Sequence, residues 1–210
     1  KLAGSWFSFA EEGFFCYWGC QGGSELISQG TTKTNADGVA MVDLPLQIGN
    51  KKMSQLYTLE ATVTDANNQS VSNRITFPVH RGTFYLGLRS SDYVVNTDKP
   101  AKFEALSVTS DGKILAKQVM EATLYQRTWN TVKRRNVDGG YYYENNYDDK
   151  QVEKKTLRTG DDGLGALEFV LKDGGSYKVE VSSADGRGNT VKSSTTVYVS
   201  SGDYINWGSE

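Results

Sequence analysis

Apolar and polar side chains alternate with a period of two residues in the clearest segment of the chain, residues 57–64. That period is typical of a half-buried β-strand. Residues 65–68 (Asp-Ala-Asn-Asn) follow, and they favour a turn because Asn and Asp tolerate left-handed backbone conformations. Residues 71–79 then resume the strand pattern. The sequence therefore predicts a β-hairpin here.

The same hairpin pattern recurs near the end of the chain. A second alternating segment begins at Tyr177, residues 185–189 (Asp-Gly-Arg-Gly-Asn) supply its turn, and residues 191–199 supply its return strand. Tyr57 aligns with Tyr177 at a shift of 120 residues.

The segment before each hairpin repeats as well. Residues 31–40 match residues 156–165, and their Asp-Gly pairs align at a shift of 125. An Asp-Gly pair between two strands favours a tight turn, because Gly supplies the positive φ. The difference of five residues between the two shifts falls in the loop 47–55, where insertions are tolerated. Two copies of a unit this large predict two domains.

The second copy carries a full upstream half. Strand patterns occupy residues 83–88, 100–108 and 119–129, and residues 133–150 are expected to form an exposed hairpin extension or a mobile loop. About seven strands over about 120 residues match one immunoglobulin-like sandwich. The first copy has only residues 1–29 upstream, so the chain is expected to be a fragment or to lack residues there.

The fold expected from these patterns is all-β, with two tandem immunoglobulin-like antiparallel β-sandwich domains. Residues 1–80 form the first, which is expected to be truncated at its N-terminus, and residues 81–201 form the second, complete one. Residues 202–210 are expected to be an exit linker toward a following domain.

The composition of the chain argues against some classes of partner but indicates no function. The net charge of −2 is spread evenly, which predicts neither a nucleic-acid nor a membrane partner. Apolar runs stay well short of the length that spans a membrane as a helix.

The cysteines, Cys16 and Cys20, lie in Cys-Tyr-Trp-Gly-Cys. With His80 as the one histidine, they cannot complete a four-ligand zinc site without carboxylates. Their spacing also differs from the Cys-x-x-Cys of redox proteins. A short-loop disulfide and a pair of free, partly buried thiols both remain open.

The sequence predicts no enzyme and no cofactor. A serine nucleophile needs a base, usually His, and His80 lies at the predicted interdomain linker. The sequence has no Gly-x-Ser-x-Gly elbow and no Gly-x-Gly-x-x-Gly loop. Asp161, Asp162 and Asp185 could bind calcium in a sandwich, but the solvated turn is the preferred interpretation.

Four tyrosines stand out within residues 133–150: Tyr141, Tyr142, Tyr143 and Tyr147. Tyr offers a large, rigid, amphipathic surface and is enriched at protein interfaces. These side chains are expected either to pack over their own sheet or to form an interface. The basic run at 133–135 is expected to pair locally with the acidic residues beside it.

The order of these motifs resembles a known family. Thr-x-x-Asp-Gly-x-Ala, then Tyr-x-Leu-Glu-Ala-x-Val-x-Asp, then Gly-Thr-Phe-Tyr-Leu-Gly-Leu-Arg, is similar to the pattern of bacterial α2-macroglobulins, long chains of macroglobulin-like domains. The matching stretches are residues 34–40, 57–65, 82–89, 103–113, 159–169 and 177–188. The resemblance implies that both sandwich domains are macroglobulin-like.

The resemblance implies a non-catalytic scaffold fragment of a broad-spectrum endopeptidase inhibitor, which traps proteases after its bait segment is cut. Its partners would be neighbouring macroglobulin-like domains and, through the full-length protein, target proteases. The implied location is the periplasm or cell envelope, as a lipoprotein anchored at the inner membrane, although the fragment itself is expected to be soluble. The Cys-x-Glu-Gln sequence of covalent capture is absent here, so these residues are not expected to form a thioester. The alternative is a cell-surface adhesin or carbohydrate-binding sandwich, with the tyrosines as its ligand platform.

Overall fold

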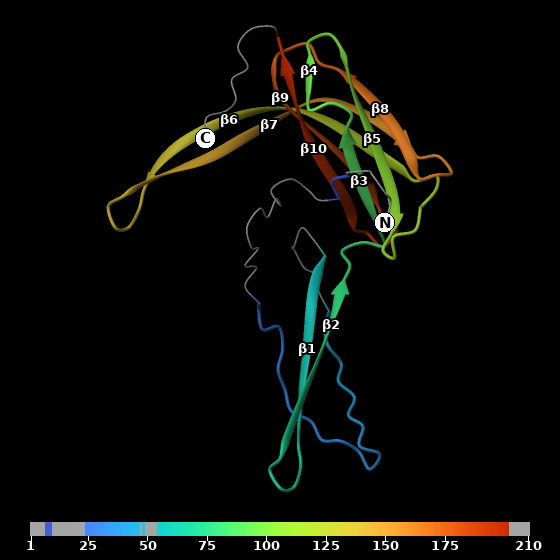
Figure 1. Ribbon diagram of the computed structural model, residues 1–210, viewed down its shortest axis with the longest axis vertical. Helices are drawn as coiled ribbons and strands as arrows, with labels where there is room; N and C mark the ends of the chain where they lie inside the picture. The colour runs from blue at the N-terminus through green and yellow to red at the C-terminus, as the bar shows by residue number, and fades with distance from the viewer. Residues whose placement is uncertain (1–6, 10–23, 47, 49–53, 202–210) are drawn as a thin grey trace. The chain divides into compact units, whose positions relative to one another are not determined.

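The computed structural model describes residues 7–9, 24–46, 48 and 54–201 (Figure 1). All regular secondary structure among them is β, so the expected all-β class is confirmed. The chain divides into two compact units. The hairpin unit holds the described residues between 24 and 81, and the sandwich unit holds residues 7–9 and 82–201.

Two sheets make up the sandwich unit. The larger has the strand order β4-β10-β9-β6-β7, and the smaller has the order β3-β5-β8. Neighbouring strands are antiparallel except β4, which runs parallel to β10. The strands are β3 (Phe84–Ser90), β4 (Val94–Asn96), β5 (Pro100–Thr109), β6 (Val119–Arg135), β7 (Tyr141–Arg158), β8 (Leu164–Val170), β9 (Gly175–Ala184) and β10 (Thr190–Ser200).

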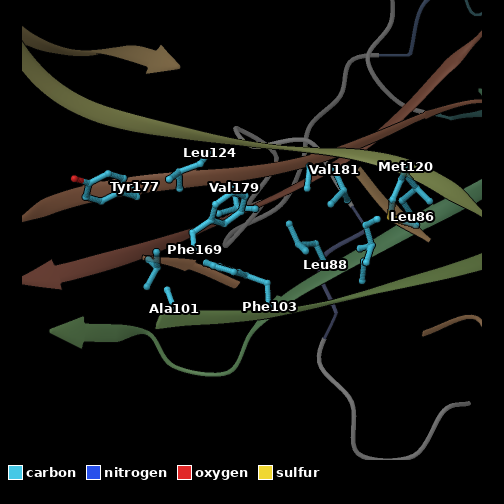
Figure 2. Close-up of a cluster of buried hydrophobic side chains, with 14 of the residues drawn as sticks. Leu86, Leu88, Ala101, Phe103, Met120, Leu124, Phe169, Tyr177, Val179 and Val181 are labelled. Atoms are coloured by element: carbon cyan, nitrogen blue, oxygen red, sulfur yellow. The ribbon is translucent and has the colours of Figure 1, made fainter. Parts of the chain in front are cut away.

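The core fills the space between these two sheets. Alternate side chains of each strand point inward, because successive residues of a strand face opposite sides. Phe103 of β5 and Phe169 of β8 meet edge to face, with ring centroids 6.2 Å apart. Figure 2 shows the side chains of the smaller sheet lying opposite those of the larger one. The labelled residues are Leu86, Leu88, Ala101, Phe103, Met120, Leu124, Phe169, Tyr177, Val179 and Val181, all buried.

Residues 7–9 correct the expected domain assignment, which placed them in the first domain. Ser8 exchanges backbone hydrogen bonds with Leu88 of β3, at 2.9 and 2.8 Å, and so extends the smaller sheet. Gly87 makes this approach possible, since a Cβ atom there would lie 2.9 Å from the Phe9 ring. Phe7 and Phe9 therefore belong with the sandwich unit.

The hairpin unit contains β1 (Gln55–Thr64) and β2 (Ser70–Val79), which pair antiparallel over their whole length, as predicted. Residues 31–46 were expected to contain a strand on each side of the Asp37-Gly38 turn, and this is wrong. They have no strand partner among the described residues and are almost wholly exposed, and a strand needs a neighbour to satisfy its backbone groups. The sandwich expected for residues 1–80 stays a prediction.

The turns of the two copies share their hydrogen bonds, which supports the internal repeat. The Asp65 carboxylate accepts from the amides of Asn67 and Gln69, and the Asp185 carboxylate accepts from the amides two and four residues further on. These two turns are 120 residues apart, as the alignment of the sequence predicts.

Two predicted features, the Cys16–Cys20 pair and the exit linker 202–210, lie outside the described residues. Among the residues that are described, no helix has the length and apolar character needed to cross a membrane.

Two glycines offer a matched test of the turns. Gly163 (φ +71°) and Gly112 (φ +82°) both have left-handed backbones, but a Cβ at Gly163 would lie 2.8 Å from a methyl carbon of Ile114, whereas Gly112 faces open space. Gly112→Ala should lower the free energy of unfolding by about 1 kcal/mol, because alanine is strained in this backbone conformation. Gly163→Ala should lower it by about 1–2 kcal/mol more, because the added methyl group is also crowded. Urea denaturation, followed through amide resonances of β9, measures both. Equal losses in the two variants would contradict the described packing around Gly163.

Candidate functional site

The most distinctive feature of the sandwich unit is a long hairpin. β6 pairs with β9 only from Glu121 to Arg127, but it pairs with β7 as far as Arg135. The part beyond β9, residues 128–148, is a two-stranded ribbon that projects away from the sheets (Figure 1). This ribbon is called the arm below. The hairpin extension expected for residues 133–150 is thereby confirmed, and it begins earlier than expected.

The register of the arm sorts its side chains onto two faces. Directly opposed residues share a face, and the face alternates along each strand. A bulge at Val152 changes the alternation of β7, since Leu124 pairs with Glu153 and Tyr125 with Gln151. The arm's odd-numbered residues therefore lie on the same face as Tyr125, the outer face of the five-stranded sheet.

An ion pair holds the base of the arm. Arg127 donates to both carboxylate oxygens of Asp149, Nε–H to Oδ1 and Nη2–H to Oδ2, each at 2.6 Å. The Arg127 side chain is fully buried, and that of Asp149 is 18% exposed. Such a two-pronged pair fixes the relative orientation of the two strands more tightly than a single contact would.

Further charges extend this pair across the outer face of the sheet. Lys178 Nζ lies 3.6 Å from Asp149 and 3.1 Å from Glu180, and Lys192 Nζ lies 2.8 Å from Glu180. Burial alone would raise the pKa of Asp149, but the hydrogen bond and charge of Arg127, with the charge of Lys178, hold that pKa below its usual value. Burial would likewise raise the pKa of Glu180, but the hydrogen bond of Lys192 and the charge of Lys178 outweigh it. The pKa of Glu180 is therefore lowered as well.

Aromatic rings and cations alternate along the odd-numbered face of the arm, the aromatic face. Arg127 lies over the Tyr147 ring, 3.8 Å from its centroid, and Tyr147 meets Trp129 edge to face at 5.4 Å. Further out, Lys133 Nζ lies 4.3 Å from the centroid of Tyr141 and 6.0 Å from that of Tyr143. These four aromatic residues are nevertheless between 45% and 67% exposed.

The opposite face of the arm is polar. Arg134 forms an ion pair with Glu144, and Tyr142 and Asp148 share this face. Of the four tyrosines singled out from the sequence, three therefore lie together and Tyr142 lies apart.

Trp129 also lies on the aromatic face, although no sequence pattern singled it out. The Asp-Gly pair at 138–139 signals a turn, but the pairing of Trp129 with Tyr147 follows from the three-residue loop 137–139 between Asn136 and Gly140.

The remaining predicted residues do not assemble into a site. Asp161 pairs with Lys117 at 2.9 Å, Asp162 caps the amide of Leu164, and Asp185 caps its own turn. No group of three or more metal-ligating side chains occurs within the described ranges. His80 is exposed and directly follows β2.

Removing the carboxylate at the base of the arm should destabilise the sandwich in a pH-dependent way. Asp149→Asn is expected to lower the free energy of unfolding by about 1–3 kcal/mol at pH 7. Because the folded pKa is depressed, this stabilisation is present above the ordinary Asp pKa of about 3.9 and is lost as pH falls through the folded value. Urea denaturation at a series of pH values should thus show the two proteins converging in acid.

Asp148→Asn is the matched control, since its side chain is exposed on the opposite face. It should change stability by less than about 0.5 kcal/mol at every pH. Equal effects of the two substitutions would show that the Arg127–Asp149 pair does not hold the arm.

The chain was compared with protein families and with solved structures. Residues 87–200 match the family described as bacterial macroglobulin domain 6. The native conformation of E. coli alpha-2-macroglobulin matches with a TM-score of 0.51 and 16% identity, over 75% of this chain and 10% of that one. Salmonella alpha-2-macroglobulin reacted with methylamine matches with a TM-score of 0.48 and 16% identity, over 72% and 11%. No curated protein matches.

The chain thus spans about a tenth of the length of these structures. At such low identity, the E. coli structure supports the β-sandwich fold and nothing beyond it. The family match is stronger evidence, because it covers more than half of the chain and takes in β4 to β10 complete, including the arm. This chain belongs to the bacterial macroglobulin domain 6 family.

Proposed function

We propose that this chain is a non-catalytic scaffold module of a bacterial α2-macroglobulin-type, broad-spectrum endopeptidase inhibitor, which traps proteases after its bait segment is cut. The observation that carries the proposal is the family match over residues 87–200. The module would act by holding neighbouring domains in place, and its own residues would take no part in chemistry.

The sandwich is suited to such a mechanical role. Its two sheets close on a core of fully buried side chains, and close-packed interiors transmit displacement rather than absorbing it. β6 and β7 continue from that core into the arm, with one bulge at Val152. A shift of a domain in contact with the arm would therefore be passed to the sandwich as a rigid movement.

The proposed partners follow from this role. They are the neighbouring macroglobulin-like domains of the same polypeptide and, through the complete protein, its target proteases. The periplasm or cell envelope is the proposed location, with the complete protein anchored at the inner membrane.

A carbohydrate-binding or adhesin function is the second candidate, favoured by the exposed rings of the aromatic face. Sugars bind aromatic residues by lying flat against the ring. On the arm, however, Arg127 already lies over the ring of Tyr147, and Lys133 over that of Tyr141. These cations compete for the surfaces that a sugar would need, so the scaffold function is preferred.

The trap function can be tested on the native polypeptide that contains this chain, recovered with an antibody raised against it. After incubation with serine and metallo-endopeptidases, that polypeptide should be cut and should retain the protease. An enclosed protease with a free active site should still cleave a small peptide, but not a large protein substrate. The isolated chain should neither hydrolyse substrates nor inhibit the proteases.

Two results would overturn the proposal. One is a native polypeptide that leaves digestion of the protein substrate unchanged. The other is saturable glycan binding by the isolated chain that Tyr141→Ala abolishes, which would support the adhesin function instead.

A further inference from the structure

The arm exposes more aromatic surface than the sandwich requires. The buried core contains no residue of the arm, and Trp129, Tyr141, Tyr143 and Tyr147 are all about half exposed or more. Clustered apolar surface of this kind on a soluble domain marks an interaction site more often than chance. Tyr and Trp are also the residues most enriched in the energetic centres of protein interfaces.

Charge is sorted between the two faces of the arm, and this indicates the partner's chemistry. Lys133 and Arg135 lie on the aromatic face, and none of the described strand residues 128–135 and 141–148 on that face is a carboxylate. Asp138 lies in the turn that joins the two strands. The arm's strand carboxylates, Glu144 and Asp148, both lie on the opposite face, where Arg134 neutralises Glu144. The aromatic face is thus apolar and cationic at once.

The aromatic face is also organised before any partner arrives. The Arg127–Asp149 pair fixes its base, and the contacts of Lys133 with two tyrosine rings restrict its outer half. A surface whose side chains are already ordered loses less conformational entropy on binding. Rings and cations that follow one another along one face of a ribbon match an extended segment in which every second residue faces the arm, and those facing residues are apolar and acidic in turn.

We infer that the aromatic face of the arm docks an acidic segment of another protein. Its carboxylates pair with Lys133 and Arg135, where the guanidinium can engage a carboxylate with two hydrogen bonds. Its apolar side chains pack against the exposed rings of Trp129 and Tyr143. The inference stands on the arm's own side chains, so its failure would leave the proposed trap function untouched.

The test uses the full chain and short synthetic peptides in which every second residue is alternately glutamate and apolar, with polar uncharged residues between them, so that glutamate and apolar side chains share one face of the extended peptide. Companion peptides replace every glutamate by glutamine or by lysine. The dissociation constant of each is measured by titration, and the amide and indole resonances of the labelled chain report the site. The acidic peptide should bind at least about tenfold more tightly than the glutamine peptide, shift the Trp129 indole resonance, and lose affinity as salt rises.

Neighbouring residues on opposite faces of the arm provide matched variants. Tyr143→Ala should weaken binding of the acidic peptide by about tenfold, while Tyr142→Ala should change it less than about twofold. Lys133→Gln combined with Arg135→Gln should likewise weaken it by about tenfold, while Arg134→Gln should have little effect. The sandwich resonances serve as a check that each variant is folded.

Four outcomes would overturn the inference. The acidic and glutamine peptides would bind equally, or neither would bind, or the substitutions on the polar face would cost as much affinity as those on the aromatic face. If the lysine peptide bound best, the partner would be basic and the charge argument would be wrong.

Discussion

The ion pair of Arg127 and Asp149 is the interaction on which the shape of the sandwich unit depends. It lies where β6 leaves the support of β9 and continues with β7 alone. A two-stranded hairpin in water is marginally stable by itself. The buried guanidinium ties the two strands together at the last point where the sheet is wide, and its contact with Tyr147 extends that tie into the arm. The pairing of residues 128–135 with residues 141–148 continues in register from the Arg127–Asp149 pair.

Much of the fold was accessible from the sequence, because alternation and turn chemistry act locally. The hairpin of Tyr57, its copy at Tyr177 and the turns that follow them formed as predicted, since a strand and its return need only a correctly placed Asn, Asp or Gly. The short strand β4 was missed because three residues carry too little periodicity. The strands expected on each side of the Asp37-Gly38 turn did not form, because pairing depends on a neighbouring strand that a local pattern cannot supply.

The candidate site was accessible only in part. The tyrosines were identifiable as a cluster, but their division between two faces depends on pairing. The bulge at Val152 makes the pattern especially hard to infer. In the inner half of β7 the odd-numbered Leu157 points into the core, yet in the outer half the odd-numbered Tyr147 lies on the outer face. Uninterrupted alternation along β7 would have placed Tyr147 on the polar face of the arm. Trp129 can be assigned to the aromatic cluster only once its pairing with Tyr147 is known.

The arm also presents an open strand edge, with consequences for how copies of this protein behave together. Beyond Arg127, β6 pairs on one side only among the described residues, and such an edge invites pairing with the same edge of another molecule. Three consecutive cations, Lys133 to Arg135, occupy the outer end of that edge and project to both faces. Like charges brought together edge to edge repel, so this run protects the exposed strand from aggregation. Salt screens these charges, so the repulsion between two such edges weakens as ionic strength rises.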